Sequence, residues 1–224
     1  MTALVLVAAS GLAGEVAAAA AANEFRYDEI VAVDDNRERW GEVIGSVDGV
    51  GGAKVIGPVE VVADCGADLV LCAGAGATRR RLAERLSGYG VAPERYATVV
   101  HPAASVPTGC ELGAGTVLLA GVVLTAGVRV GRHVVAMPNA VLTHDDIVGD
   151  YATLCAGVTL GGEVVIGEAA YLGMSSSVRQ RTTVGADSVL GMGAVLLSDL
   201  PAGETWAGVP ARRLPARSIK HVRS

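Results

Sequence analysis

The chain has 224 residues, of which 51% are hydrophobic and only 4% are aromatic, and it contains 30 glycines. Such a length allows one large domain or two modest ones, and a core of small and aliphatic side chains indicates β structure with a narrow interior. The formal net charge of -5 excludes an overall basic field for nucleic acid, and no apolar run reaches the roughly 18 residues of a membrane helix.

The start of the chain, MTALVLVAAS, is apolar but has no basic segment before it. It therefore predicts a first strand rather than a signal peptide. The four cysteines form no C-x-x-C pair and indicate buried thiols in a reducing compartment. We expect a cytoplasmic protein.

Strand and helix patterns alternate over residues 1–100. The first strand is followed by a glycine turn and an alanine-rich helix, predicted over Glu15–Asn23. A second strand ends at Asp34 and Asp35, and ADLVLCAGAGATRRRLAERL repeats the order of strand, turn and helix. This alternation predicts a small parallel sheet of Rossmann type.

The first turn, AASGLAG, approximates the dinucleotide fingerprint G-x-G-x-x-G. Gly11 and Gly14 match, an alanine takes the first glycine place, and Ser10 lies between. In such folds the turn amides meet phosphate at a helix N-terminus, and an acid about 20 residues on, here Asp34 or Asp35, meets a ribose or base. A tight turn without a ligand is the structural alternative. The small domain favours the mononucleotide end of a substrate over NAD.

From Val106 onwards an aliphatic residue recurs at every sixth position. Fifteen of the sixteen residues at this spacing up to Leu196 are Leu, Ile or Val, and the other is Ala136. An α-helix would scatter these side chains around its axis, whereas a β-solenoid with one short strand and one corner per six residues places them all inside. Three such units would close a coil of about 18 residues. We predict an all-β parallel solenoid over residues 101–210 and a basic tail over residues 211–224.

The six-residue repeat resembles that of the hexapeptide-repeat acyltransferases, whose solenoid is a left-handed β-helix. PAGETWAGVPARRL at Pro201–Leu214 is similar to the segment that ends the solenoid in that superfamily. HPAASV at His101–Val106 resembles the H-P-S-A junction that precedes it. A Rossmann-like domain before the solenoid resembles the NeuD/PglD-like sugar acetyltransferases in particular.

This resemblance implies acetyl-CoA as cosubstrate and a sialic acid or nucleotide-linked amino sugar as acceptor. It also implies an N-terminal domain that binds the nucleotide, and a homotrimer with active sites between neighbouring solenoids. Members often have G-x-S-G-H-G in the first turn. Leu12 and Ala13 depart from this pattern, so the nucleotide and the sugar stay open.

His144 and Asp145 interrupt the apolar repeat in AVLTHDDIVGD. An amine or hydroxyl must lose a proton as it attacks a thioester, and imidazole accepts protons near neutral pH. Asp145 could hold the ring in one tautomer, and the amide of Gly162, one coil further on, could stabilise the oxyanion. Ala126 and Gly162 stand one predicted coil before and after His144, so we expect open space for a ligand there. The family pattern, H-E or H-D, matches; an exposed coil-edge histidine is the structural alternative.

Two positions near this pair depart from the family. Asp146 takes a small inward position, where an unpartnered carboxylate would be costly. We expect it to be hydrogen-bonded or to face an opening that shapes the acceptor pocket. Thr153 stands where many members have a second histidine, near the acyl site. The remaining histidines form no evident three-histidine zinc set, so we expect no metal.

Coenzyme A carries phosphates, which cations on the solenoid could bind. Arg179 and Arg181 lie two coils beyond His144, and Arg212 begins the basic tail; the structural alternative is a solvated basic surface. The resemblance adds candidates for contacts with pantetheine and adenine: Gly162, Gly173, Gly208 and Pro210.

Aliphatic residues also recur outside the inward register, and they predict a subunit interface: Val117, Val123, Val135, Val141, Val165 and Val195. The first hypothesis is direct acetyl transfer from acetyl-CoA to a nucleotide-linked amino sugar, with His144 as general base. Sugar O-acetylation of the sialic-acid type and a non-catalytic trimeric scaffold that binds a nucleotide sugar stay open. An NAD-linked oxidoreductase rests only on the incomplete glycine fingerprint.

Overall fold

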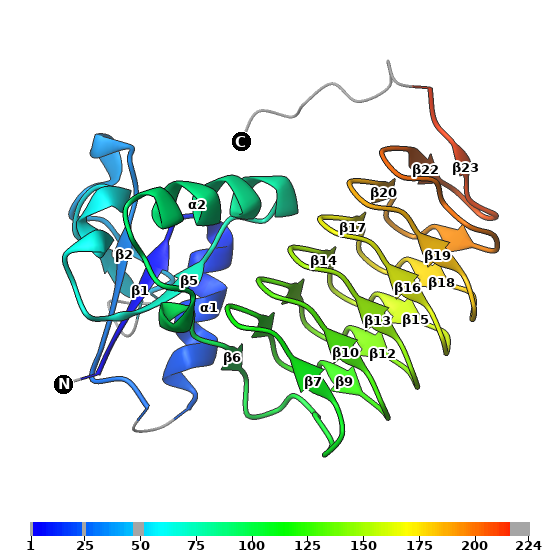
Figure 1. Cartoon of the computed structure of the whole chain (residues 1–224), viewed down its shortest axis with the longest axis horizontal. Helices are drawn as coiled ribbons and strands as arrows, with labels where there is room; N and C mark the ends of the chain where they lie inside the picture. Colours follow the sequence, from blue (N-terminus) through cyan, green and yellow to red (C-terminus); the bar gives the residue numbers. More distant parts are fainter. Residues whose placement is uncertain (1, 24–25, 47–51, 216–224) are drawn as a thin grey trace.

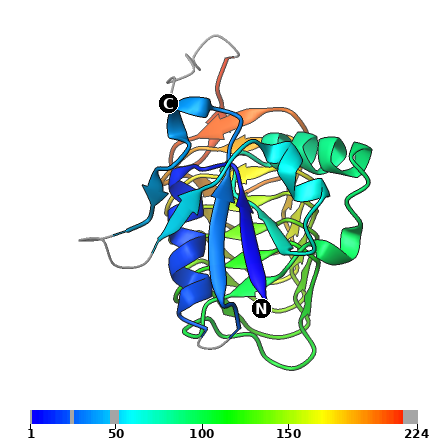
Figure 2. The same ribbon diagram turned by 90° about the vertical axis from the view of Figure 1, so that its left-hand side faces the viewer.

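The computed structural model describes residues 2–23, 26–46 and 52–215 (Figure 1). An α/β part at the amino end is followed by a β-solenoid whose stacked coils continue to the carboxyl end. Seen from the amino-terminal side, the sheet of the first part lies in front of the coils (Figure 2). Of the predicted basic tail, residues 216–224 lie outside the described residues.

The amino-terminal part is a five-stranded sheet in the order β3-β4-β2-β1-β5. The neighbours β4, β2, β1 and β5 run parallel, and β3 pairs antiparallel with β4. The alternation of apolar strands and helices thus produced a largely parallel sheet. Its elements are β1 (Ala3–Val7), α1 (Gly11–Ala21), β2 (Glu29–Val33), β3 (Val43–Ile44), β4 (Ala53–Val55), β5 (Asp68–Leu71) and α2 (Gly76–Gly88), with 3-10 helices at Arg37–Arg39, Val59–Ala63 and Pro93–Arg95.

Helix α1 begins at Gly11, so the sequence-based start at Glu15 was wrong. The glycines that suggested a separate turn lie inside the first turns of the helix. A Cβ at Gly14 would lie 3.0 Å from the Cα of Gly45. Glycine is therefore needed there because the helix packs closely on the loop after β3, and not because the chain turns.

The solenoid has three faces, and each is a parallel sheet of stacked short strands. Val117 pairs with Val135, and Val135 pairs with Thr153, so that each residue pairs with the one three repeats further along the chain. This register confirms the predicted coil of three six-residue units. The inward residue of each strand is the repeating aliphatic one, and Leu118, Leu154 and Leu172 among others have no exposed surface.

The first face consists of β6 (Val99–Val100), β8 (Val117–Leu118), β11 (Val135–Ala136), β14 (Thr153–Leu154), β17 (Tyr171–Leu172), β20 (Val189–Leu190), β22 (Thr205–Ala207) and the antiparallel β23 (Arg212–Arg213). The second face consists of β9 (Val123–Leu124), β12 (Val141–Leu142), β15 (Thr159–Leu160), β18 (Ser177–Val178) and β21 (Val195–Leu196). The third face consists of β7 (Glu111–Leu112), β10 (Arg129–Val130), β13 (Ile147–Val148), β16 (Val165–Ile166) and β19 (Thr183–Val184).

The amino-terminal part covers the first face of the solenoid. Helix α1 lies between the sheet and this face (Figure 1), and its buried residues form one cluster with Val117 and Val135. These two valines are fully buried within the chain. Because they are buried within the chain, the prediction that they belong to a subunit interface was wrong. Val165 on the third face, by contrast, is 40% exposed.

Arg79 of α2 fastens the amino-terminal part to the solenoid. Its guanidinium is buried, and it donates to the carbonyls of Ala73 and Gly74 in the loop after β5. On the solenoid side its acceptors belong to two successive coils: the carbonyls of His133, Tyr151 and Ala152 and the hydroxyl of Thr153. All of its bonds go to neutral oxygens, so the side chain acts as a clamp between backbone segments.

Within the described residues, no helix is long and apolar enough to cross a bilayer. The four cysteines are free: Cys72 and Cys155 are buried, but Cys65 and Cys110 are only partly so. The expectation that all four are buried thiols was therefore right for two of them. Burial raises the pKa of the Cys72 thiol well above its usual range.

Candidate active site

His144 and Asp145 lie at the corner between β12 and β13, that is, between the second and third faces. Because this corner does not border the first face, we call it the far corner; Ala126, His144, Gly162, Gln180 and Ser198 follow one another along it. His144 Nδ1 is 2.9 Å from an Asp145 carboxylate oxygen. Both side chains are more than half exposed, at 59% and 67%.

The backbone of the corner turns Asp145 toward the ring. Asp145 has φ +62°, and a positive φ recurs at the matching position of the corners before and after it. Aspartate accepts this left-handed conformation more readily than most residues. Aspartate therefore fits the backbone conformation that this corner of the coil requires, and its carboxylate can also pair with the adjacent histidine.

Gly162 lies directly beside the imidazole of His144. A Cβ at Gly162 would be 2.2 Å from His144 Nε2 and 2.4 Å from Cε1. The ring itself occupies the space beside Gly162 in which we expected room for a ligand. Ligand binding next to this exposed ring stays a prediction. The predicted coil length did place the two residues together. Within the described residues the Gly162 N–H makes no hydrogen bond, and the residue is buried beneath the ring.

Asp146 faces the interior of the solenoid and has no exposed surface. Its carboxylate accepts hydrogen bonds from Thr143 N at 2.7 Å and from Val164 N at 2.8 Å. Burial raises its pKa to about 6, although these two N–H groups and His144 act in the opposite direction. Of the two expected alternatives, hydrogen bonding is the one observed. The side chain joins the coil of His144 to the coil of Gly162 and offers no surface to an acceptor.

Arg179 and Arg181 lie at the far corner on the same side as His144. With Gln180 and residues of the next coil they line a pocket of about 370 Å³. Arg181 pairs with Glu163 at 2.9 Å, and this contact raises the pKa of Arg181. The structure thus aligns the predicted base, the glycine and the two arginines along one edge.

The other predicted coenzyme A contacts lie near the corner between the first and second faces. A Cβ at Gly173 would be 2.5 Å from Met192 N, so glycine is required there by coil stacking. The segment from Gly208 to Arg212 includes Pro210. It begins beside β21 of the second face, where the Gly208 carbonyl accepts from Val195 N, and it ends at Arg212 in β23 of the first face. Thr153 is buried on the first face and donates to the Gly74 carbonyl, away from the far corner.

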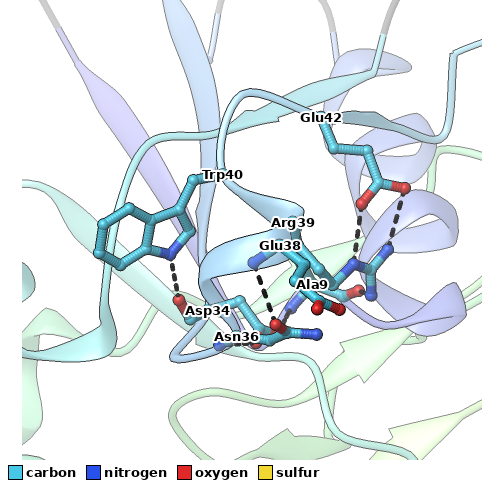
Figure 3. Close-up of polar contacts among 7 residues, drawn as sticks. All are labelled: Ala9, Asp34, Asn36, Glu38, Arg39, Trp40 and Glu42. Atoms are coloured by element: carbon cyan, nitrogen blue, oxygen red, sulfur yellow. Dashed lines mark hydrogen bonds and ion pairs between the residues drawn. The ribbon is translucent and has the colours of Figure 1, made fainter.

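The first turn of the amino-terminal part has a network of polar contacts (Figure 3). Asp34 accepts from Ala9 N at 2.8 Å and from Asn36 N at 2.9 Å. Ser10 donates its hydroxyl to the Cys72 carbonyl, and a side chain at Gly11 would meet no atom within 4 Å. The turn therefore leaves the start of α1 open.

A pocket of about 540 Å³ lies beside this turn. It is lined by Ser10, Gly11, Gly14, Glu15, Ala18, Arg39, Glu42, Val43, Ile44 and Gly45. Sequence reasoning missed Arg39 and Glu42, although the charged run DDNRERWGE directly after the second strand contains both.

Asp35, the other predicted acid, is engaged elsewhere. It accepts from Val59 N at 3.1 Å and pairs with Arg85 of α2. The hydrogen bond from Arg85 lowers the pKa of Asp35. Of the two acids, Asp34 is the one that belongs to the first turn.

The two predicted halves of the site do not meet within one chain. The amino-terminal pocket belongs to the part that covers the first face, whereas His144 is at the corner that does not border that face. Among the described residues, no three His, Cys, Asp or Glu side chains are grouped so that they could hold a metal ion.

An α/β part seated on a solenoid of six-residue repeats, with a histidine and an aspartate paired at an exposed corner, is the construction of a hexapeptide-repeat acyltransferase. No protein-family model matches the chain, and no curated protein does. Solved structures do. The acetyltransferase domain of PglB from Neisseria gonorrhoeae, in complex with acetyl coenzyme A, is 32% identical with a TM-score of 0.84, over 95% of this chain and 98% of that chain.

PerB from Caulobacter crescentus, in complex with CoA and GDP-perosamine, is 26% identical with a TM-score of 0.82, over 96% of this chain and 98% of that one. WeeI from Acinetobacter baumannii, at 24% identity and a TM-score of 0.79 over 96% of this chain and 100% of its own, shares the fold. On its likeness to the PglB domain, the chain belongs to the hexapeptide-repeat sugar acetyltransferases.

Proposed function

We propose that the protein transfers an acetyl group from acetyl-CoA directly to the amino group of a nucleotide-linked amino sugar. Residues 1–100 form the Rossmann-like domain that binds the nucleotide sugar, and residues 101–210 form a left-handed β-helix that carries out the transfer. The observation that carries the proposal is the position of the His144 ring. The ring lies between Asp145 and Gly162, at an exposed edge that also bears Arg179 and Arg181. Two structural neighbours, the PglB domain and PerB, were solved with acetyl coenzyme A or CoA.

The chemistry follows from which ring nitrogen is engaged. With Nδ1–H donating to Asp145, Nε2 of His144 keeps its lone pair and accepts a proton from the acceptor amine. The amine nitrogen forms a bond with the thioester carbon, the carbon–sulfur bond breaks, and coenzyme A leaves as a thiolate that is then protonated. The Gly162 N–H stabilises the negative charge that develops on the carbonyl oxygen.

The substrates would approach His144 from two sides. Arg179 and Arg181 are placed to bind phosphates of coenzyme A along the far corner. The nucleotide sugar that reacts at His144 would be bound in the amino-terminal pocket of another copy, because the pocket of the same chain lies on the opposite side of the solenoid. This separation supports a homotrimer in which neighbouring subunits complete each site.

The test is to measure release of the coenzyme A thiol with acetyl-CoA and a panel of UDP-, GDP- and dTDP-linked amino sugars. His144→Ala should lower kcat by about 10²- to 10⁴-fold, the usual contribution of general base catalysis. Asp145→Asn should retain binding of both substrates and lower kcat. A His144→Ala variant with nearly wild-type turnover would refute the mechanism, and acetyl-CoA binding without turnover on any amino sugar would refute the acceptor class.

A further inference from the structure

We propose that Arg39 binds the diphosphate of the nucleotide sugar, and that Glu42 holds this guanidinium until the substrate takes its place. The inference rests on the proposed function, because it assigns two residues of the amino-terminal pocket to the nucleotide-linked acceptor. It adds that the Arg39 guanidinium exchanges the Glu42 carboxylate for the diphosphate when the substrate binds.

Arg39 is placed at the first turn by its own contacts. Its Nη1 donates to the Ala9 carbonyl, which lies one residue before Ser10 (Figure 3). The side chain is about one-third exposed, at 32%. It thus reaches from the 3-10 helix after β2 across to the end of β1, and it lines the pocket beside the first turn.

Besides the open start of α1, the described part of the pocket has a single cation with which to receive a diphosphate. Among the described residues that line it, Arg39 is the only arginine or lysine, while Glu15 and Glu42 are acids. Without the guanidinium the pocket would repel a dianion. Arginine suits this task because its planar donors fit the oxygens of a phosphate in pairs.

Glu42 now occupies the positions that phosphate oxygens would take. Arg39 Nε is 2.8 Å from one carboxylate oxygen and Nη2 is 3.2 Å from the other, so the pairing is bidentate. The hydrogen bond from Arg39 lowers the pKa of Glu42, which keeps the carboxylate ionised. The Glu42 side chain is nearly half exposed, at 47%, and ion pairs exposed in this way are weak. A diphosphate with two charges can therefore displace it.

The exchange predicts opposite effects of two substitutions. Arg39→Gln removes the cation and should weaken diphosphate binding by about tenfold or more, as expected for a charge-assisted bidentate contact. Glu42→Gln removes the competing carboxylate and should strengthen binding by up to about fivefold, the range of exposed ion pairs. Glu38→Gln, on the same 3-10 helix, removes an equal charge without touching Arg39 and serves as the control.

The experiment is calorimetric titration of the full-length protein with UDP, GDP and dTDP and with the matching monophosphates. The expected order of diphosphate affinity is Glu42→Gln, then wild type and Glu38→Gln together, then Arg39→Gln, with smaller differences for monophosphates. Weaker binding by Glu42→Gln would show that Glu42 positions Arg39 and does not compete. Unchanged binding by Arg39→Gln would overturn the assignment. A wild-type protein that binds none of the nucleotides would contradict the proposed function itself.

Discussion

Replacing Gly162 by alanine tests the geometry of the far corner, because the added methyl group collides with the imidazole of His144. The Cβ would lie 2.2 Å from Nε2, whereas unbonded heavy atoms approach to about 3.5 Å. The ring must therefore move by about 1.3 Å or swing away. Displacements of about 1 Å cost roughly 10²-fold in rate, so kcat should fall about 100-fold, or about 2.7 kcal/mol in barrier height.

The fold should tolerate this substitution. Gly162 is not among the glycines with positive φ, so alanine fits its backbone, and the imidazole is exposed enough to move into solvent. We expect a thermal midpoint within about 3 °C of wild type, since a change of 1 kcal/mol shifts the midpoint by about 2–4 °C in a chain of this size. Gly88→Ala at the end of α2, where a Cβ meets no atom within 4 Å, is the matched control and should keep full activity.

The assay is thiol release at saturating acetyl-CoA and amino sugar, with thermal unfolding of the same samples. If the kcat of Gly162→Ala were within threefold of the wild-type value, catalysis would not depend on the observed position of the imidazole, and the proposed geometry would be wrong. If activity and thermal midpoint fell together by a large amount, the loss would reflect unfolding instead of ring displacement.

Four further predictions concern stability, pH and assembly. Arg79→Met leaves buried carbonyls of two coils without a donor and should destabilise the protein by about 3–5 kcal/mol in urea unfolding; a change below 1 kcal/mol would contradict the clamp. Burial lowers the pKa of His133 to about 4, below its unfolded value of about 6.5, so stability should be complete above pH 6.5 and fall by about 3 kcal/mol towards pH 4; His133→Asn should lose this slope. The pKa of Asp146 is raised to about 6, so its ionisation should cost about 3 kcal/mol as pH rises from about 4 to 6, a slope that Asp146→Ser should abolish. At low nucleotide-sugar concentration, mixed oligomers of His144→Ala and Arg39→Gln should turn over faster than the two variants measured apart if sites form between subunits, because some sites then combine an intact His144 with an intact Arg39; no gain would place each site in a single chain.

The solenoid could be predicted because the pattern that produces it repeats within every six residues of the sequence. An inward aliphatic at every sixth position can be counted in the sequence, and the register between neighbouring coils follows from three strands per coil. That register also brought His144 next to Gly162. It could not reveal that the ring fills the space above the glycine, because the side-chain orientation depends on the left-handed corner at Asp145.

The contact between the two parts was not predictable from the residues. Val117 and Val165 have the same position in the repeat, yet the first is buried against the amino-terminal part and the second is exposed. Nothing in the run of three arginines in α2 distinguishes Arg79, which is buried, from Arg80, which pairs with Glu168 at the surface. Which face is covered depends on contacts distant in sequence, and these have no periodic signal.

The pairing of each strand with the one three repeats away makes the length of the solenoid change in whole coils. A single six-residue repeat inserted between Gly162 and Arg179 would shift everything that follows onto the next side of the prism, and both arginines would leave the edge that carries the imidazole. A complete added coil would keep them on that edge but about 5 Å further away. Insertions or deletions can therefore change the distance between the two arginines and His144 along this edge only in steps equal to the spacing of adjacent β-strands.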